Sequence, residues 1–246
     1  VDGSISSTIT IAVDDGNSDD DFDSVANQTV SVTTTDDDVA GFTIVESDGS
    51  TSVDESGTTD AFTVVLDAEP ISDVVLTVTS SDTGEATVTS TLTFTSANWD
   101  TPQIVTVSGA DESIIDGDQT STITVTIDDA NSDNNFHSVA NQTVSVTTTD
   151  DDVAGFTIVE SDGSTEVAES GTTDTFTIVL DAEPASDVVL TVTSSDPGEA
   201  TVTSTLTFTS ANWDTAQTIT VTGVDDNLVD GSISSTITIA VDDGNS

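Results

Sequence analysis

The stretch VSVTTTDDDVAGFTIVE occurs twice in this chain, at residues 30–46 and again at residues 144–160. In each copy, apolar and polar residues alternate, three Asp residues and a Gly follow, and a second alternating run begins. A period of two is typical of a β-strand with one buried face. The stretch therefore predicts two strands joined by an acidic linker, and we expect a domain boundary inside that linker.

The whole chain of 246 residues follows the same repeat. Asp-Gly pairs begin at Asp2, Asp116 and Asp230, each 114 residues after the last, and residues 1–18 recur without a mismatch at 229–246. A fixed period indicates tandem units that contact mainly their neighbours. We expect residues 1–36 to be the C-terminal part of one repeat, residues 37–150 to be a complete repeat, and residues 151–246 to be a repeat that lacks its last strand.

Within the complete repeat, Thr, Val and Ile fill short alternating runs, and these residues suit a half-buried pleated surface. No run has a convincing helical period. Seven or eight short strands per repeat predict an all-β protein of tandem antiparallel immunoglobulin-like sandwiches. We interpret Trp99 and Trp213, in the repeated ANWD, as core residues that close one end of each sandwich. The predicted strands are 42–46, 62–67, 74–79, 86–89, 91–95, 104–107, 122–127 and 143–148.

The composition excludes several functions. The chain has no Lys, Arg or Cys, and its 47 Asp and Glu residues give it a formal charge of −47. Without basic residues it has no footprint for nucleic acid, and an anionic membrane would repel it. Thiol chemistry, disulfides and CxxC zinc sites all need Cys. Self-repulsion at this charge must be relieved from outside, by divalent cations or by the screening of concentrated salt.

The acids are clustered, which favours bound cations over salt alone. The linker triplet is Asp36–Asp38 in one copy and Asp150–Asp152 in the next. A second cluster is Asp111-Glu112 with Asp116, repeated as Asp225-Asp226 with Asp230. Ca²⁺ takes six to eight oxygen ligands and would remove the repulsion between such carboxylates. We therefore expect Ca²⁺ as the cofactor, and a solvated acidic surface is the alternative.

A third acidic stretch lies between residues 14 and 23. Asp15, Asn17, Asp19, Asp21 and Asp23 alternate somewhat as in an EF-hand loop, but the Gly at loop position 6 and the Glu at position 12 are missing. In the next copy Asp23 is replaced by His137, the only His of the chain, so we interpret His137 as a surface substitution. Whether this stretch forms a separate ion site is left as an open question. We expect the protein to have no enzymatic activity.

Several motifs in order resemble the Calx-beta domain. They are VDESG at 53–57 and VAESG at 167–171, GVDDNLVDG at 223–231, and VSVTTTDDD at 144–152. The resemblance covers the whole repeat and implies an immunoglobulin-like sandwich with Ca²⁺ sites at one end. Similar domains recur in giant repetitive bacterial adhesins.

The resemblance also implies a ligand set, carried over position by position. Asp116 and Asp230 stand where the family has the longer Glu, and Glu112 replaces the second Asp of its pair. The implied ligands are Asp36, Asp37, Asp38, Glu55, Asp82, Asp111, Glu112, Asp116, Asp150, Asp151, Asp152, Glu169, Asp196, Asp225, Asp226 and Asp230.

The expected function is that of a structural spacer. Ca²⁺ at each linker would stiffen a series of sandwiches in a secreted adhesin or filament, located outside the cell or at its surface. The expected partners are neighbouring repeats, with head-to-tail association in which the strand Thr29–Thr35 of one molecule completes the sandwich that begins at Gly155 of another. The alternatives are a Ca²⁺-sensing module and a halophilic surface or sheath protein without specific ion sites.

Overall fold

The computed structural model describes residues 3–229 and 231–244. The chain divides into two compact units, one built mainly of residues before Thr149 and the other mainly of residues after it. Their regular elements are antiparallel β-strands and two short 3₁₀ turns. The prediction of an all-β protein is confirmed. No helix in the described part of the chain is long and apolar enough to span a membrane.

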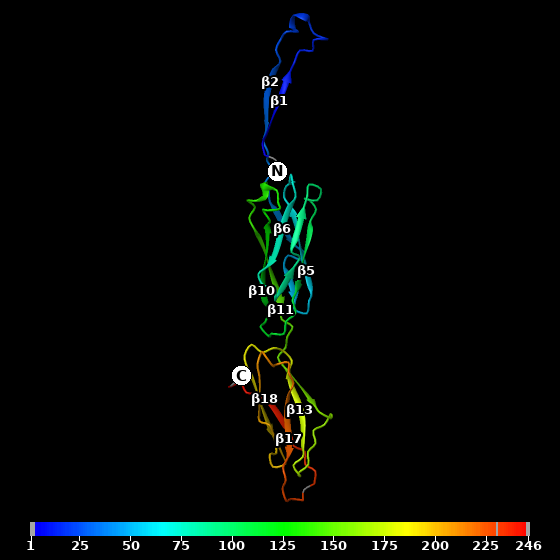
Figure 1. Ribbon diagram of the computed structural model, residues 1–246, viewed down its shortest axis with the longest axis vertical. Coiled ribbons are helices and arrows are strands. Elements are labelled where there is room, and N and C mark those ends of the chain that lie inside the picture. The colour runs from blue at the N-terminus through cyan, green and yellow to red at the C-terminus, as the bar shows by residue number, and fades with distance from the viewer. Residues whose placement is uncertain (1–2, 230, 245–246) are drawn as a thin grey trace. The chain divides into compact units, whose positions relative to one another are not determined.

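The first element is a hairpin of β1 (Ile5–Ile11) and β2 (Gln28–Thr34), seen at the blue end of the ribbon in Figure 1. The two strands pair from Ile5 opposite Thr34 to Ile11 opposite Gln28 and form a sheet of two strands. The loop between them holds the 3₁₀ turn η1 (Asp20–Phe22), which Asp19 caps by accepting a hydrogen bond from the Asp21 N–H. Every residue of both strands is exposed.

The first sandwich consists of two antiparallel sheets (Figure 1). One sheet has the order β3 (Phe42–Glu46), β5 (Thr59–Leu66), β9 (Gln103–Gly109), β7 (Ala86–Val88). The other has the order β4 (Thr51–Asp54), β11 (Gln142–Thr149), β10 (Gln119–Ile127), β6 (Val74–Ser80), β8 (Thr91–Phe94). The turn η2 (Asn134–Phe136) lies in the loop between β10 and β11.

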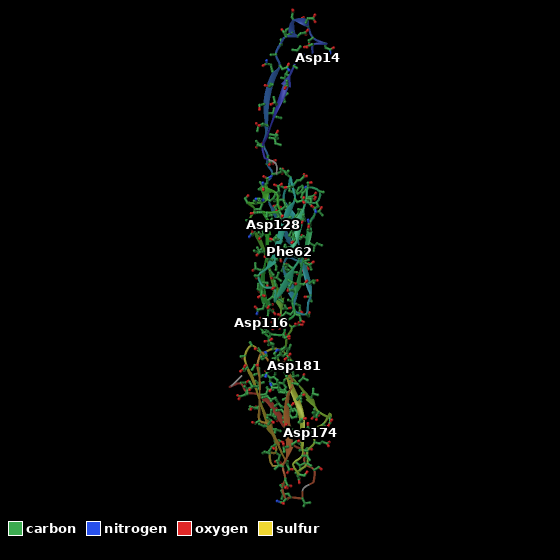
Figure 2. All side chains as sticks on the ribbon, viewed as in Figure 1. Asp14, Phe62, Asp116, Asp128, Asp174 and Asp181 are labelled. Atoms are coloured by element: carbon green, nitrogen blue, oxygen red, sulfur yellow. The ribbon has the colours of Figure 1, made fainter. Side chains whose placement is uncertain are left out.

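The core of this sandwich is the set of alternate apolar residues that face inward from both sheets. Phe62, labelled in Figure 2, is 1% exposed, and Phe94 and Phe136 are fully buried. Trp99 is partly buried and packs against this core, and its backbone carbonyl accepts a hydrogen bond from the Leu66 N–H. The alternating pattern of the sequence thus corresponds to the inward faces of the strands. The aliphatic core residues include Val64, Leu76, Val78, Val105, Val107, Ile123, Val125, Val144 and Val146.

The second sandwich repeats this arrangement with fewer strands. One sheet has the order β12 (Phe156–Glu160), β13 (Thr173–Leu180), β17 (Gln217–Gly223), β15 (Ala200–Val202). The other has the order β16 (Thr205–Phe208), β14 (Val188–Ser194), β18 (Ile237–Val241). The strand β18 pairs with β14 in the register that β10 has with β6, since Ile239 opposes Val192 as Val125 opposes Val78.

The predicted strands all occur, with most ends differing by one to three residues, but β4 was not predicted. β4 lies beside β11 at the edge of its sheet. The corresponding residues of the second sandwich, 165–168, form no strand, and within the described chain no counterpart of β11 lies beside them. The strand β4 therefore depends on its neighbour more than on its own sequence, as edge pairing often does.

Candidate metal centre

The acidic residues that gather in the first sandwich come from four loops at strand ends. Glu55 follows β4, Glu85 precedes β7, Glu112 and Asp116 lie between β9 and β10, and Asp150 with Asp152 follow β11. Asp116 is labelled at one end of this sandwich in Figure 2. Strand ends bring these loops together although they lie up to about a hundred residues apart in sequence.

Two overlapping groups of carboxylates result. The first is Glu55, Glu85, Glu112 and Asp116, and the second is Glu55, Asp150 and Asp152. Within each group one oxygen of every residue lies within 4.8 Å of the corresponding oxygens of the others. Glu55 belongs to both groups and is 0% exposed. We call these six residues the carboxylate cluster.

Burial and mutual repulsion act together on the carboxylate cluster. Burial raises the pKa of Glu112, and the nearby charges of Asp116 and Asp152 raise it further. Burial likewise raises the pKa of Asp152, helped by Asp150, Asp151 and Asp111. Among the described residues, no donor reaches the buried Oε1 of Glu112 or the buried Oδ2 of Asp152. The cluster is thus a set of partly desolvated anions in a chain without Lys or Arg.

Backbone hydrogen bonds hold the cluster in place. The carboxylate of Asp150 accepts from the Gly117 N–H at 2.8 Å and from the Asp152 N–H at 2.8 Å. Gly117 has a φ of 74°, a left-handed conformation that glycine adopts without strain. The Glu55 N–H donates to the Thr149 carbonyl at 3.2 Å, which ties the Glu55 loop to the end of β11. The geometry is therefore set by the backbone and not by attraction between the side chains.

The geometry of the carboxylate cluster fits Ca²⁺. Ligand oxygens lie 2.3–2.6 Å from this ion, so two ligands on opposite sides of it are about 5 Å apart. The oxygens of each group lie within 4.8 Å of one another, so one ion of this size could contact all the carboxylates of a group. Only hard oxygen donors are present, which favours Ca²⁺ or Mg²⁺ over zinc. Asp116 joins the first group, so its shorter side chain still reaches the other carboxylates.

Three other residues of the predicted set in this sandwich are not in either group. Asp82, Asp111 and Asp151 are exposed. The carboxylate of Asp82 accepts from the Gly84 N–H at 2.9 Å, so it supports its own turn. That these three residues bind an ion stays a prediction.

Glu85 is the member of the cluster that sequence reasoning missed. It lies three residues after Asp82 in the same loop, is only 9% exposed, and its carbonyl accepts from the Ala110 N–H at 2.9 Å. The signal was available, because GEATV occurs in both copies and places an acid directly before the buried Ala86 and Ala200. An acid next to a buried strand residue is more informative than an acid at the tip of a turn.

The remaining predicted ligands lie in the segment that follows the β1–β2 hairpin and in the second sandwich. Asp36, Asp37 and Asp38 follow β2, and Asp36 accepts from the Gly3 N–H at 2.8 Å and from the Asp38 N–H at 3.1 Å. Glu169 and Asp226 are half-buried and Asp196 and Asp225 exposed, and the structure gathers none of these four into a group. Asp230 lies outside the described residues.

The loop between β10 and β11 contains one buried acid, Asp133, whose role differs from that of the carboxylate cluster. Asp133 is 5% exposed, and its carboxylate accepts from the Ile71 N–H at 2.7 Å, the Ser72 N–H at 3.1 Å and the Asn135 N–H at 2.9 Å. Burial opposes ionisation, but these backbone bonds lower the pKa of Asp133. Asp133 therefore caps backbone groups. His137 is exposed and its ring contacts the Ser132 carbonyl at 3.2 Å.

No protein-family model and no curated protein matches the sequence. Among solved structures, domains 4 and 5 of the S-layer protein SbsC are 25% identical with a TM-score of 0.31, over 50% of this chain and 59% of that one. The calcium binding domain CBD12 of CALX1.1 is 14% identical with a TM-score of 0.34, and the match covers 72% of this chain and 74% of that one. Domains 4–9 of SbsC are 18% identical with a TM-score of 0.32, and the chain spans 33% of their length. Likeness at such TM-scores carries no argument about function.

Proposed function

We propose that these sandwiches are Ca²⁺-stabilised repeats that act as spacers in a large extracellular structural protein. The observation that carries the proposal is the carboxylate cluster itself. Six carboxylates converge, Glu55 is fully buried, and the chain has no Lys or Arg to balance them. A divalent cation turns that repulsion into attraction. Binding to the folded state at 100 times Kd adds about 2.7 kcal/mol to its stability.

The place of the cluster in the chain supports a mechanical role. β11 ends at Thr149 and β12 begins at Phe156, so Asp150 and Asp152 belong to the segment that connects one sandwich to the next. An ion held by these residues and by Glu55 would restrict that connecting segment. In this proposal each sandwich has other sandwiches of its kind as neighbours, in series or head to tail, and the chain catalyses no reaction.

An extracellular location agrees with this ion requirement. Ca²⁺ sites of extracellular modules work at about 10⁻⁴–10⁻³ M, so a partly exposed site without exceptional affinity would be filled there. A surface adhesin or an extracellular filament is the proposed context, because repeated sandwiches provide length in either.

Calorimetric titration of Ca²⁺ into the metal-free chain tests the proposal. We expect saturable binding that Glu55→Gln abolishes at the first sandwich, since Glu55 belongs to both groups. Glu55→Gln should also raise the melting temperature of the metal-free protein, because it removes a buried charge. The matched control is Asp100→Asn, which removes one exposed charge elsewhere. Equal Ca²⁺ binding by both variants would contradict the assignment.

A further inference from the structure

Asp116 is the one residue of the carboxylate cluster that is followed by glycine. In an Asp-Gly pair the glycine nitrogen attacks Cγ of the Asp side chain readily, because glycine has no side chain to hinder the approach. The new N–Cγ bond closes a succinimide ring, and the amide proton and the carboxyl OH leave together as one molecule of water. Water then adds to either ring carbonyl, so the products are aspartate and its isomer isoaspartate. Asp116, labelled in Figure 2, is exposed and open to this reaction.

Isoaspartate at this position would damage the carboxylate cluster. The main chain of isoaspartate runs through the former side-chain carbonyl, which adds one methylene group to the backbone, and the remaining carboxylate is attached directly to Cα. One oxygen of Asp116 now lies within 4.8 Å of oxygens of Glu55, Glu85 and Glu112. Isomerisation would move this carboxylate and the backbone of Gly117 together. A molecule that has reacted therefore loses one charged member of the first group.

The structure engages the nucleophile of this reaction in a hydrogen bond. The Gly117 N–H donates to Oδ2 of Asp150 at 2.8 Å. The nitrogen must lose its proton as it attacks, and losing it beside a carboxylate would place two negative charges side by side. The same bond recurs between the Gly3 N–H and Oδ2 of Asp36, also at 2.8 Å, so it is a regular feature of the repeat. Asp150 therefore protects Asp116 from attack.

The chain also contains the reactive pair in surroundings without this protection. Asp48-Gly49 lies in the exposed turn between β3 and β4, and Asp162-Gly163 is its exposed counterpart in the second sandwich. The glycines of all three pairs have φ between 74° and 82°, so their backbone conformation is alike. Among the described residues, none accepts a hydrogen bond from the glycine N–H of the first turn, and the N–H of the second reaches only the Glu160 carbonyl, at 3.5 Å.

The two groups of the carboxylate cluster contain both partners of the reaction. Asp116 carries the carboxyl group that is attacked and belongs to the first group, and Asp150 holds the attacking Gly117 nitrogen and belongs to the second. Burial and the charge of Asp116 raise the pKa of Glu112, and burial and the charge of Asp150 raise the pKa of Asp152, so a neighbour repels each partner. A cation in the cluster would relieve this repulsion. It would also lose a charged ligand if the ring formed, so its binding opposes the reaction.

We propose that Asp116 is a site of isoaspartate formation that becomes reactive when the carboxylate cluster loses its cation, whereas Asp48 and Asp162 are modified at the same rate with or without it. Loss of Ca²⁺ then leads to slow covalent damage of the empty metal site. The proposal rests on the proposed function, because it takes the cluster to bind Ca²⁺. The protection by Asp150 needs no cation and is tested separately.

The two exposed pairs serve as internal references in the test. The full chain is kept at physiological temperature and pH for several weeks in Ca²⁺, in EGTA, and in EGTA with urea. Endoproteinase Asp-N cleaves before aspartate but not before isoaspartate, so peptide mass spectrometry of one digest gives the modified fraction at Asp48, Asp116 and Asp162. We expect the rate at Asp116 to equal the rate at Asp48 in urea, to be lower in EGTA and to be lowest in Ca²⁺.

Variants in EGTA test the hydrogen bond without the cation. Asp150→Ala should raise the rate at Asp116 about tenfold and leave the rate at Asp48 unchanged, since a hydrogen bond to a charged acceptor is lost. Asp150→Asn keeps an acceptor oxygen and should keep most of the protection. The matched control Asp118→Ala removes an exposed charge next to Gly117 and should change the rate less than about twofold. Circular dichroism establishes that each variant is folded, and the wild-type comparison of Ca²⁺ with EGTA needs no variant.

Three outcomes decide the proposal. An equal ratio of the Asp116 and Asp48 rates in Ca²⁺ and in EGTA would overturn it, and if calorimetry on the same samples still showed Ca²⁺ binding, the proposed function would stand. A chain that binds no Ca²⁺ would overturn both. The supporting outcome is a ratio that rises in EGTA, together with a loss of Ca²⁺ sites, measured after Ca²⁺ is added back, that equals the isoaspartate fraction at Asp116.

Discussion

At the scale of single residues, burial distinguishes two acids of one loop, Glu85 in the carboxylate cluster and Asp82 outside it. Asp82 and Glu85 occupy one loop, yet only Glu85 is buried and joins Glu55, Glu112 and Asp116. Buried carboxylates that repel one another oppose folding in a chain without Lys or Arg, and the cation that we propose would explain how the fold retains them. The two residues therefore offer a direct comparison of a proposed ligand with a turn residue.

Glu85→Gln should weaken Ca²⁺ binding about tenfold or more, since it removes one charged ligand from the first group. Asp82→Asn in the same loop should leave the affinity within about twofold, because Asp82 bonds only its own turn in this structure. Both affinities can be measured by calorimetric titration in low salt. The reverse order of effects would favour Asp82, the residue that the family resemblance implied.

The pH dependence of the metal-free protein follows from the raised pKa values of Glu112 and Asp152. Since these groups bind protons more readily in the folded state than in the unfolded state, stability should rise as the pH falls from 7 toward about 5. Asp133 and Asp60 have lowered pKa values, so their contribution is lost only below about pH 4.

Thermal melts in chelator should therefore show a maximum in mildly acidic buffer. Saturating Ca²⁺ should remove the rise between about pH 7 and pH 5, because the ion favours the charged forms. In chelator, Asp152→Asn should reduce part of this rise in melting temperature. A metal-free protein that loses stability steadily from neutral pH downward would contradict the assignment of buried, repelling carboxylates.

At the scale of the elements, one turn shows how much a strand pair depends on its surroundings. Phe136 of η2 is fully buried in the first sandwich, whereas Phe22 of η1 is exposed beside the free hairpin. Phe136→Ala should reduce the free energy of unfolding by about 3–5 kcal/mol through the cavity that it leaves. Phe22→Ala should leave the stability of the monomer within about 0.5 kcal/mol. Urea denaturation of both variants measures the contrast, and similar losses would contradict the packing described.

Sequence periodicity predicted the longer strands whose alternate residues face the core. Val74–Ser80 and Gln142–Thr149 were found because their alternation reports the buried face directly. β4 was missed, since Thr51–Asp54 is short and becomes a strand only beside β11. The site was predicted only in part for a similar reason. Clusters of acids adjacent in sequence could be recognised, but the burial of Glu85 depends on loops that lie far apart in sequence.

At the scale of the whole molecule, the proposal concerns the segment between β11 and β12. Asp151→Asn with Asp152→Asn should alter the orientation of neighbouring sandwiches more than it destabilises either core, because the cores consist of Val, Ile, Leu and Phe. Small-angle X-ray scattering with Ca²⁺ should give a shorter maximum dimension for the double variant than for the wild type. An unchanged maximum dimension would count against stiffening by ions.

The central claim is that specific Ca²⁺ binding, and not ionic screening, offsets a charge of −47 in a chain without Lys or Arg. Thermal unfolding in Ca²⁺, in EGTA, and in EGTA with NaCl at matched and at high ionic strength tests it most directly. The account predicts a large loss of melting temperature in EGTA that NaCl restores only in part, because screening acts weakly on buried carboxylates. Full recovery of the melting temperature in EGTA with NaCl would contradict it.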